Sequence, residues 1–283
     1  MPIDKEVFAY DADKLATNLT QMTYSNAIRP VVLLQITDIH LHAAADVRMR
    51  GVATYETFLA VLDQVQSDAR WPPDAIVVTG DIVQDESRAG YKHFRKILKP
   101  LGIPIFCLPG NHDNLQLMVE MLADAPFQIC GEATIANWML VFLNTLTGCE
   151  AGGRLGKEEL IRLSNTLAEH PDKHMLICMH HQPLPMGSIW LDKIGLIDAK
   201  EFLACIEQYE NVRGVLWGHV HQVSDRTRDG IRFLSAPSTC VQFLPGSDTF
   251  ALGTQPPGSR WLILETEGII STEINWLTED KAT

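Results

Sequence analysis

Short apolar runs alternate with amphipathic stretches along most of this chain, and this alternation most constrains its fold. Apolar runs bounded by turn residues are typical of buried strands, whereas apolar residues at helical spacing are typical of helices. The runs predict strands over residues 31–37, 74–79, 104–108, 138–144, 174–179 and 212–217. The periodic stretches predict helices over 55–69 (with Thr54 as N-cap), 87–99, 157–168 and 199–209. Such alternation predicts layered α and β structure with the helices outside.

The last part of the chain changes character, because the helical patterns stop. Asp229–Gly230 is typical of a hairpin turn leading into a strand over 231–235, and residues 261–266 and 268–277 predict a final strand pair. The glycine- and proline-rich segment 244–260 is expected to be a long loop. This all-β tail indicates a mixed sheet or a second sheet, and a two-sheet sandwich flanked by helices fits it.

The 283 residues are enough for one large domain or two small ones, and 46% of them are apolar, which allows a sizeable core. We expect a leader over residues 1–30 and a single domain over residues 31–283. Within that domain, residues 236–283 are expected to form a variable C-terminal part of strands and loops.

Charge and cysteine usage limit the partners and the compartment. A net charge of −12 argues against nucleic acid, because phosphate backbones are held by lysine and arginine. The acidic N-terminus does not resemble a signal peptide, and no apolar run is long enough to cross a membrane. The six cysteines are scattered without a Cys-x-x-Cys pair, which favours a reducing compartment. We therefore expect a cytoplasmic protein with no membrane partner. Its oligomeric state is left open, a homodimer included.

Five of the predicted strands end at polar clusters. Because ligand sites gather outside the carboxyl ends of strands in open α/β sheets, neighbouring strands would bring these clusters to one rim. The clusters are Asp38-Ile39-His40, Gly80-Asp81, Gly110-Asn111-His112-Asp113, His180-His181 and Gly218-His219-Val220-His221.

These residue types are suited to metal ions. Imidazole binds zinc, iron and manganese, while carboxylate and amide oxygens bind manganese or magnesium. Asp-x-His and His-x-His place two side chains on the same side of an extended segment, so that one strand end can hold one ion. A carboxylate such as Asp81 can bridge two ions. A lone histidine is more often structural, but five clusters in this order indicate a binuclear site.

Some polar residues near the clusters receive other interpretations. We interpret His42, His93, His170 and His174 as structural, whereas His181 could line the pocket. Asp113 is expected to be the N-cap of a helix that follows it, and Asp85 is expected to orient His112.

The motifs DIH, GD, GNHD, the isolated His and GHVH resemble those of the calcineurin-like metallophosphoesterase superfamily, over about residues 31–240. Within it, LQITDIHL, LPGNHD, HHQPLPMGSIWLD and PSTCVQF resemble the bacterial class III cyclic nucleotide phosphodiesterases, the 3′,5′-cyclic AMP phosphodiesterase group. The resemblance implies a two-sheet β-sandwich flanked by α-helices. It assigns one metal ion to Asp38, His40, Asp81 and His221, and the other to Asp81, Asn111, His180 and His219.

The resemblance also implies a reaction. Two divalent ions, iron or manganese with zinc or another transition metal as alternatives, would hold a bridging hydroxide that hydrolyses 3′,5′-cyclic AMP to 5′-AMP. His112 is implied as the catalytic residue beside the leaving group, with His40, Asn111, His112 and His221 contacting the substrate. Base contacts are expected from residues 182–195 and 237–246, including Trp190, Ser238, Thr239 and Phe243, with modest discrimination between bases.

Three alternatives remain. The first is a broad-range phosphodiesterase acting on other cyclic nucleotides or on linear phosphodiesters. The second, a nuclease, is disfavoured by the acidic charge. The third, a non-catalytic interaction module, is disfavoured because all seven candidate ligands are present.

Overall fold

Two six-stranded sheets form the centre of this computed structural model, which describes residues 28–148 and 150–278. The first sheet has the strand order β14-β13-β1-β4-β5-β6, in which β1, β4, β5 and β6 are parallel. Its strands are β1 (Val31–Ile36), β4 (Ala75–Val78), β5 (Ile105–Cys107), β6 (Phe127–Ile129), β13 (Gly258–Leu264) and β14 (Ile270–Trp276).

The second sheet has the order β11-β12-β10-β9-β8-β7, with β8, β9, β10 and β12 parallel. Its strands are β7 (Gly131–Ile135), β8 (Trp138–Phe142), β9 (His174–Cys178), β10 (Val212–Trp217), β11 (Ser224–Arg228) and β12 (Ile231–Ser235). A separate two-stranded hairpin joins β2 (Arg48–Met49) to β3 (Val52–Ala53).

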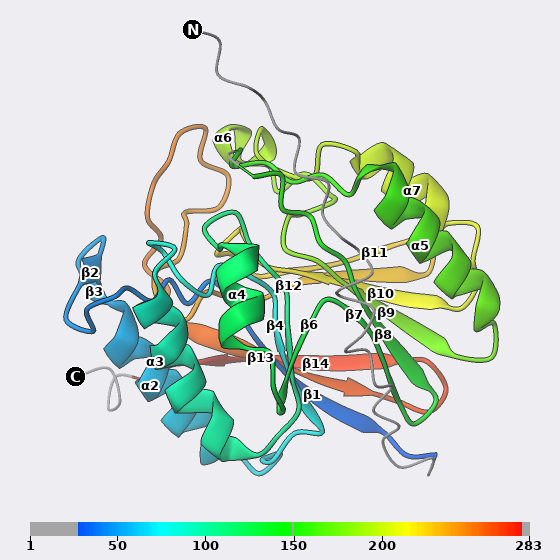
Figure 1. Ribbon diagram of the computed structural model, residues 1–283. Coiled ribbons are helices and arrows are strands. Elements are labelled where there is room, and N and C mark those ends of the chain that lie inside the picture. Colours follow the sequence, from blue (N-terminus) through cyan, green and yellow to red (C-terminus); the bar gives the residue numbers. More distant parts are fainter. Residues whose placement is uncertain (1–27, 149, 279–283) are drawn as a thin grey trace, which may run out of the picture.

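Helices cover the outer faces of the two sheets (Figure 1). Helices α2 and α3 lie on one side of the molecule, and α5 and α7 lie on the other. The helices are α2 (Thr54–Gln66), α3 (Arg88–Leu98), α4 (Leu115–Met121), α5 (Gly156–Glu169), α6 (Ile189–Asp192) and α7 (Ala199–Ile206), with a 3₁₀ turn η1 (Lys99–Leu101) after α3. The N-cap prediction was wrong, because Thr54 is the first residue of α2 and Ala53 precedes it.

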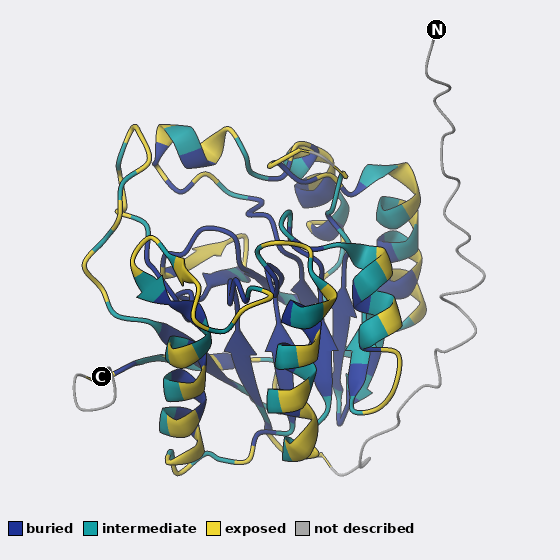
Figure 2. Ribbon diagram, turned by 60° about the vertical axis from the view of Figure 1, so that its left-hand side comes forward, coloured by how far each residue is buried: buried dark blue, intermediate teal, exposed yellow. Residues whose placement is uncertain are grey.

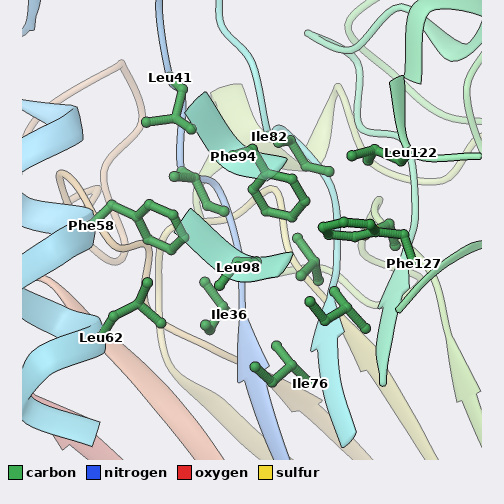
Figure 3. Packing of buried hydrophobic residues seen from close by; sticks show 14 of the residues in the cluster. Ile36, Leu41, Phe58, Leu62, Ile76, Ile82, Phe94, Leu98, Leu122 and Phe127 are labelled. Atoms are coloured by element: carbon green, nitrogen blue, oxygen red, sulfur yellow. The ribbon is translucent and has the colours of Figure 1, made fainter. Parts of the chain in front are cut away.

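The central strands of each sheet, such as β1, β4, β9 and β10, are buried on both faces, which explains why they are mostly apolar rather than alternating. On β1, Leu34 and Ile36 face α2 and α3, where they pack with Phe58 and Phe94 (Figure 3). Leu33 faces the other way and packs between the two sheets. A fully buried leucine or phenylalanine stabilises the fold by about 1.5–3 kcal/mol relative to its exposed state. Figure 2 shows the result as dark strands enclosed by helices whose outer surfaces are exposed.

The predicted fold class is confirmed, since the structure is a two-sheet sandwich flanked by helices. The strands β6 and β7 and the hairpin β2–β3 had no counterpart in the sequence prediction. The expected leader lies outside the described residues except for 28–30, and the division into one domain stays a prediction. No helix within 28–148 or 150–278 is long and apolar enough to span a membrane.

Candidate metal centre

The five polar clusters converge at one rim of the sandwich, as expected from strand order. Three of them follow β1, β4 and β5, which are adjacent in the first sheet, and two follow β9 and β10, which are adjacent in the second. Hydrogen bonds join the two sheets directly at this rim. The backbone N–H of His219 donates to both carboxylate oxygens of Asp38, at 3.0 and 3.1 Å. Below it, the Gln35 amide donates to Thr79 and to the carbonyl of Trp217.

The carboxylate of Asp81 lies between two groups of donor atoms. Its Oδ2 is 3.7 Å from Nε2 of His40, and its Oδ1 is 3.5 Å from Nε2 of His180. One oxygen therefore faces each side, which is the arrangement that a bridging carboxylate requires. The side chain of Asp81 is almost completely buried, and its Oδ1 also accepts a hydrogen bond from the backbone N–H of His112, at 2.9 Å.

The group on one side of Asp81 contains Asp38, His40 and His221. The Nε2 atoms of His40 and His221 are 3.1 Å apart, and Nε2 of His221 is 3.4 Å from Oδ1 of Asp38. These three side chains are buried. They bring together two imidazoles and a carboxylate, beside the Asp81 carboxylate.

The group on the other side contains Asn111, His180 and His219. Nε2 of His180 is 3.2 Å from Oδ1 of Asn111, and the rings of His180 and His219 are 5.0 Å apart between centroids. The structure therefore brings together all seven side chains that the sequence singled out as candidate ligands.

The hydrogen bonds of the histidines test whether this set fits a metal ion. Nδ1 of His180 donates to the carbonyl of Thr79, and Nδ1 of His221 donates to the carbonyl of Val241, each at 2.7 Å. A proton held on Nδ1 leaves Nε2 with a free lone pair that points to the cluster, the usual arrangement for a ligating histidine. Nε2 of His219 is buried and has no partner among the described residues. These donor atoms fit divalent metal ions.

The charges of the cluster favour the same interpretation. Burial lowers the pKa of His40 to about 4 and holds the pKa of His219 well below its usual value, so both rings are neutral at pH 7. Burial alone would raise the pKa of Asp81, but the neighbouring His180 outweighs it and holds that pKa well below the usual range. Neutral imidazole and ionised carboxylate are the forms that bind metal. Burial alone would lower the pKa of His180, but the Asp81 carboxylate outweighs it and raises that pKa to about 9, so this ring would release a proton when an ion binds.

The backbone of the site is strained. Five of the seven candidate ligands have a positive φ between 44° and 66°, which is uncommon for residues other than glycine. They are Asp38, His40, Asp81, His219 and His221. Each costs on the order of 1–3 kcal/mol, and such residues gather at functional sites. Close packing adds a second constraint, because a Cβ on Gly110 would collide with the carboxylate of Asp81.

Two interpretations of acidic residues were wrong. The N-cap of α4 is Asn114, whereas the buried Asp113 accepts hydrogen bonds from three backbone N–H groups, those of Ile82, Val83 and Gly110, and from the hydroxyl of Tyr91. Asp113 thus ties together the two loops that carry Asp81 and Asn111. The partner of His112 is the Gln84 amide, 3.1 Å from Nδ1, rather than Asp85.

Two further side chains near the cluster are less suited to metal binding. Both ring nitrogens of His181 have partners, at 2.8 Å from Thr145 Oγ1 and 3.2 Å from the Ala151 carbonyl. The thiol of Cys240 lies near His40 and His221, but burial raises its pKa to about 12, so it stays protonated. A thiolate is needed for ligation.

A pocket of about 490 Å³ opens above the candidate centre. Six of its lining residues come from the clusters: His40, Asp81, Asn111, His112, His219 and His221. The aromatic rings of Trp190, Phe243 and Phe250 form one wall, of which the first two were expected there. The sequence interpretation missed His42, Arg48 and Arg50, which also line the pocket. His42 could have been found, since the sequence places it two residues after His40 in an Asp-x-His-x-His pattern.

Comparison with known proteins agrees with this geometry. A family model described as calcineurin-like phosphoesterase matches residues 31–223. The chain is 40% identical over 248 residues to the 3′,5′-cyclic adenosine monophosphate phosphodiesterase CpdA of Vibrio vulnificus, covering 87% of this chain and 90% of that protein. It is 37% identical over 252 residues to the protein of the same name from Escherichia coli, covering 89% and 91%.

Solved structures show the same architecture. A dimetal phosphatase from Danio rerio superposes with a TM-score of 0.62, covering 88% of this chain and 99% of that chain. The sequence identity is 14%, so this likeness concerns the fold alone.

Proposed function

We propose, from the premise that this chain belongs to the calcineurin-like phosphoesterase family, that it hydrolyses 3′,5′-cyclic AMP to 5′-AMP. It is a metal-dependent phosphodiesterase acting on a small-molecule substrate. The relatives that carry this activity in their names are matched over most of their length as well as most of this chain.

The observation that carries the proposal is the position of Asp81 between two donor groups. One ion would be held by Asp38, His40, Asp81 and His221, and the other by Asp81, Asn111, His180 and His219. The facing oxygens of Asp81 and the free Nε2 of His219 support this division. We propose iron or manganese as the ions, with zinc as an alternative, because mixed imidazole and oxygen donors suit all three.

When bound, such ions supply a water nucleophile at neutral pH and neutralise charge on the phosphoryl oxygens. The chain itself supplies the groups around the leaving oxygen. The Gln84 amide can only donate to Nδ1 of His112, which places the ring proton on Nε2. His112 lines the pocket, so we assign to its Nε2–H the protonation or stabilisation of the departing 3′-oxygen.

The remaining substrate contacts follow from the pocket lining. His40, Asn111, His112 and His221 all line it, which supports their assignment to the phosphate end of the substrate. The base would reach the wall of Trp190, Phe243 and Phe250. Aromatic rings pack against any base and present few fixed donors or acceptors, whereas sharp rejection of an analogue requires buried polar groups left unpaired.

That aromatic wall favours a second candidate function, a broad-range phosphodiesterase for small cyclic or linear diesters. The two functions are separated by measuring kcat/KM for cyclic AMP, cyclic GMP and bis(p-nitrophenyl) phosphate under the same metal conditions. The proposed function predicts turnover of cyclic AMP with discrimination against cyclic GMP within about tenfold, or about 1.4 kcal/mol. Fast cleavage of the linear diester without cyclic AMP turnover would replace it with the second function.

Location and assembly are further parts of the proposal. The five cysteines in the described part of the chain are all free, which supports a reducing, cytoplasmic location. The net charge of −12 supports a small substrate in preference to nucleic acid. A homodimer remains a prediction that light scattering of the purified protein can test.

A further inference from the structure

The hairpin β2–β3 places two arginines at the pocket in spite of the acidic character of the chain. Arg48 and Arg50 both line the pocket, together with Met49 between them. Asp81 is the single acidic residue among the lining residues, and it belongs to the candidate metal centre. Within residues 28–148 and 150–278, neither arginine forms an ion pair. The mouth of the pocket therefore carries positive charge without a counter-ion from the described protein.

The turn of this hairpin has an unusual residue at its first position. Met49 pairs with Val52, so Arg50 and Gly51 form a two-residue turn, and their φ angles are 54° and 90°. Positive φ at both positions is typical of a type I′ turn, for which Asn-Gly, Asp-Gly and Gly-Gly are strongly preferred. An arginine there costs conformational free energy that asparagine or glycine would avoid. Strained residues of this kind gather at ligand-binding sites.

The orientation of Arg50 indicates what it can bind. Its guanidinium carbon lies 4.8 Å above the ring of Phe250, which belongs to the loop after residue 243. Figure 1 shows the hairpin and this loop, drawn in orange, on the same side of the molecule. The stacked face of the guanidinium is thus covered, and its N–H groups have no hydrogen-bond partner among the described residues. Guanidinium edges bind phosphate or carboxylate oxygens in the plane of the group.

Binding of cyclic AMP alone gives no role to the two arginines at the pocket. It carries one negative charge, on the phosphate that the proposed function places at the metal centre. We propose that Arg48 and Arg50 form a second anion subsite, which binds a further phosphate group on the ligand. The class of ligand is a nucleotide or phosphodiester with two separate phosphates. This inference rests on the proposed function, because that function fixes the position of the first phosphate.

The test compares ligands that differ by a single phosphate. Dissociation constants are measured by titration calorimetry on the full chain loaded with Mn²⁺, for 5′-AMP against adenosine 3′,5′-bisphosphate and for ApA against pApA. We expect the second phosphate to tighten binding at least about tenfold in one of the two pairs, as charge-assisted hydrogen bonds do. In the variant with Arg48→Gln and Arg50→Asn, this preference should fall to within about twofold.

The variants are chosen so that folding does not obscure the result. Asparagine followed by Gly51 is the preferred pair for this turn, so Arg50→Asn keeps the hairpin. The control variant, Lys92→Gln with Lys96→Gln, removes the same charge from exposed positions on α3 and should keep the preference. A wild-type protein without preference in either pair overturns the inference, and so does a preference that survives in the arginine variant. Neither 5′-AMP nor adenosine 3′,5′-bisphosphate contains a phosphodiester bond to cleave, so binding of this pair is measured without turnover, and failure of the cyclic AMP assay would be recognised separately.

Discussion

The ring of Phe243 lies flat against the imidazole of His221, with the centroids 4.0 Å apart and the planes inclined by 7°. His221 is also held by the hydrogen bond from its Nδ1 to the carbonyl of Val241. One candidate ligand is therefore fixed both on its face and at its edge by the segment that follows Cys240. Trp190 and Phe250 in turn pack edge-on against Phe243.

Replacing Phe243 with leucine should weaken metal binding on the His221 side. Leucine keeps apolar contact but lacks the flat face, so the imidazole gains freedom to rotate. Groups that orient a ligating histidine typically contribute about 10–100-fold in metal affinity. Titration of metal-free protein with Mn²⁺ measures the change. Phe250→Leu is the matched control, because Phe250 contacts Phe243 and has no ring contact with His221. An equal loss in both variants would contradict the positioning role.

Removal of metal should abolish activity and lower thermal stability together. Nε2 of the buried His219 has no partner among the described residues until an ion binds, and an ion held by these side chains stabilises only the folded state, so a chelated protein should melt at a lower temperature. Metal analysis should give close to two ions per chain. Readdition of Mn²⁺ should restore both properties. Full turnover in a preparation shown to be free of metal would exclude the proposed mechanism.

His112→Ala should slow the reaction while metal content stays unchanged. A positioned acid or base typically contributes about 10²–10⁴-fold to the rate. The loss should be smaller for a nitrophenyl diester, whose leaving group needs no proton, than for cyclic AMP. Gln84→Leu removes the amide that sets the ring proton on Nε2. It should cause a smaller loss of rate, which is again greater for cyclic AMP than for the nitrophenyl diester. Identical losses for both substrates would indicate that His112 acts by position alone.

Asp113→Asn should destabilise the protein without removing a candidate ligand. Burial raises the pKa of Asp113 to about 6, and its oxygens accept from three backbone N–H groups and a tyrosine hydroxyl. An amide would turn an NH₂ group toward some of these donors. The expected cost in the free energy of unfolding is about 1–3 kcal/mol, measured by urea denaturation. The exposed Asp172→Asn serves as control, and a comparable effect there would contradict the explanation.

The sequence predicted the candidate metal ligands better than the groups that hold those ligands in place. Asp38 and His40, and likewise His219 and His221, are two positions apart and follow an apolar run, so local spacing was enough to find them. The support of His180 comes from the backbone carbonyl of Thr79, which no side-chain pattern can reveal. The predicted partner of His112 was wrong, because Asp85 turns its carboxylate to the backbone of Ala43 and Ser87.

The hairpin β2–β3 was not predicted from the sequence for a different reason. Its strands have two residues each, too short for an alternating pattern, and the turn uses arginine where asparagine is usual. The contact between Arg50 and Phe250 joins residues 200 positions apart. Long strands buried on both faces were recognisable from composition alone, whereas this part depends on tertiary contacts.

The division of donors between the two sheets makes the centre an interface inside one chain. The first sheet carries Asp38, His40, Asp81 and Asn111, and the second carries only imidazoles, those of His180, His219 and His221. Neither half can complete a coordination shell by itself, so ion binding and the docking of the halves are thermodynamically linked. Bound ions would link the two sheets to each other at the rim of the sandwich. Substitutions in the apolar layer between the sheets, such as at Leu140 or Leu216, would then lower ion affinity from a distance.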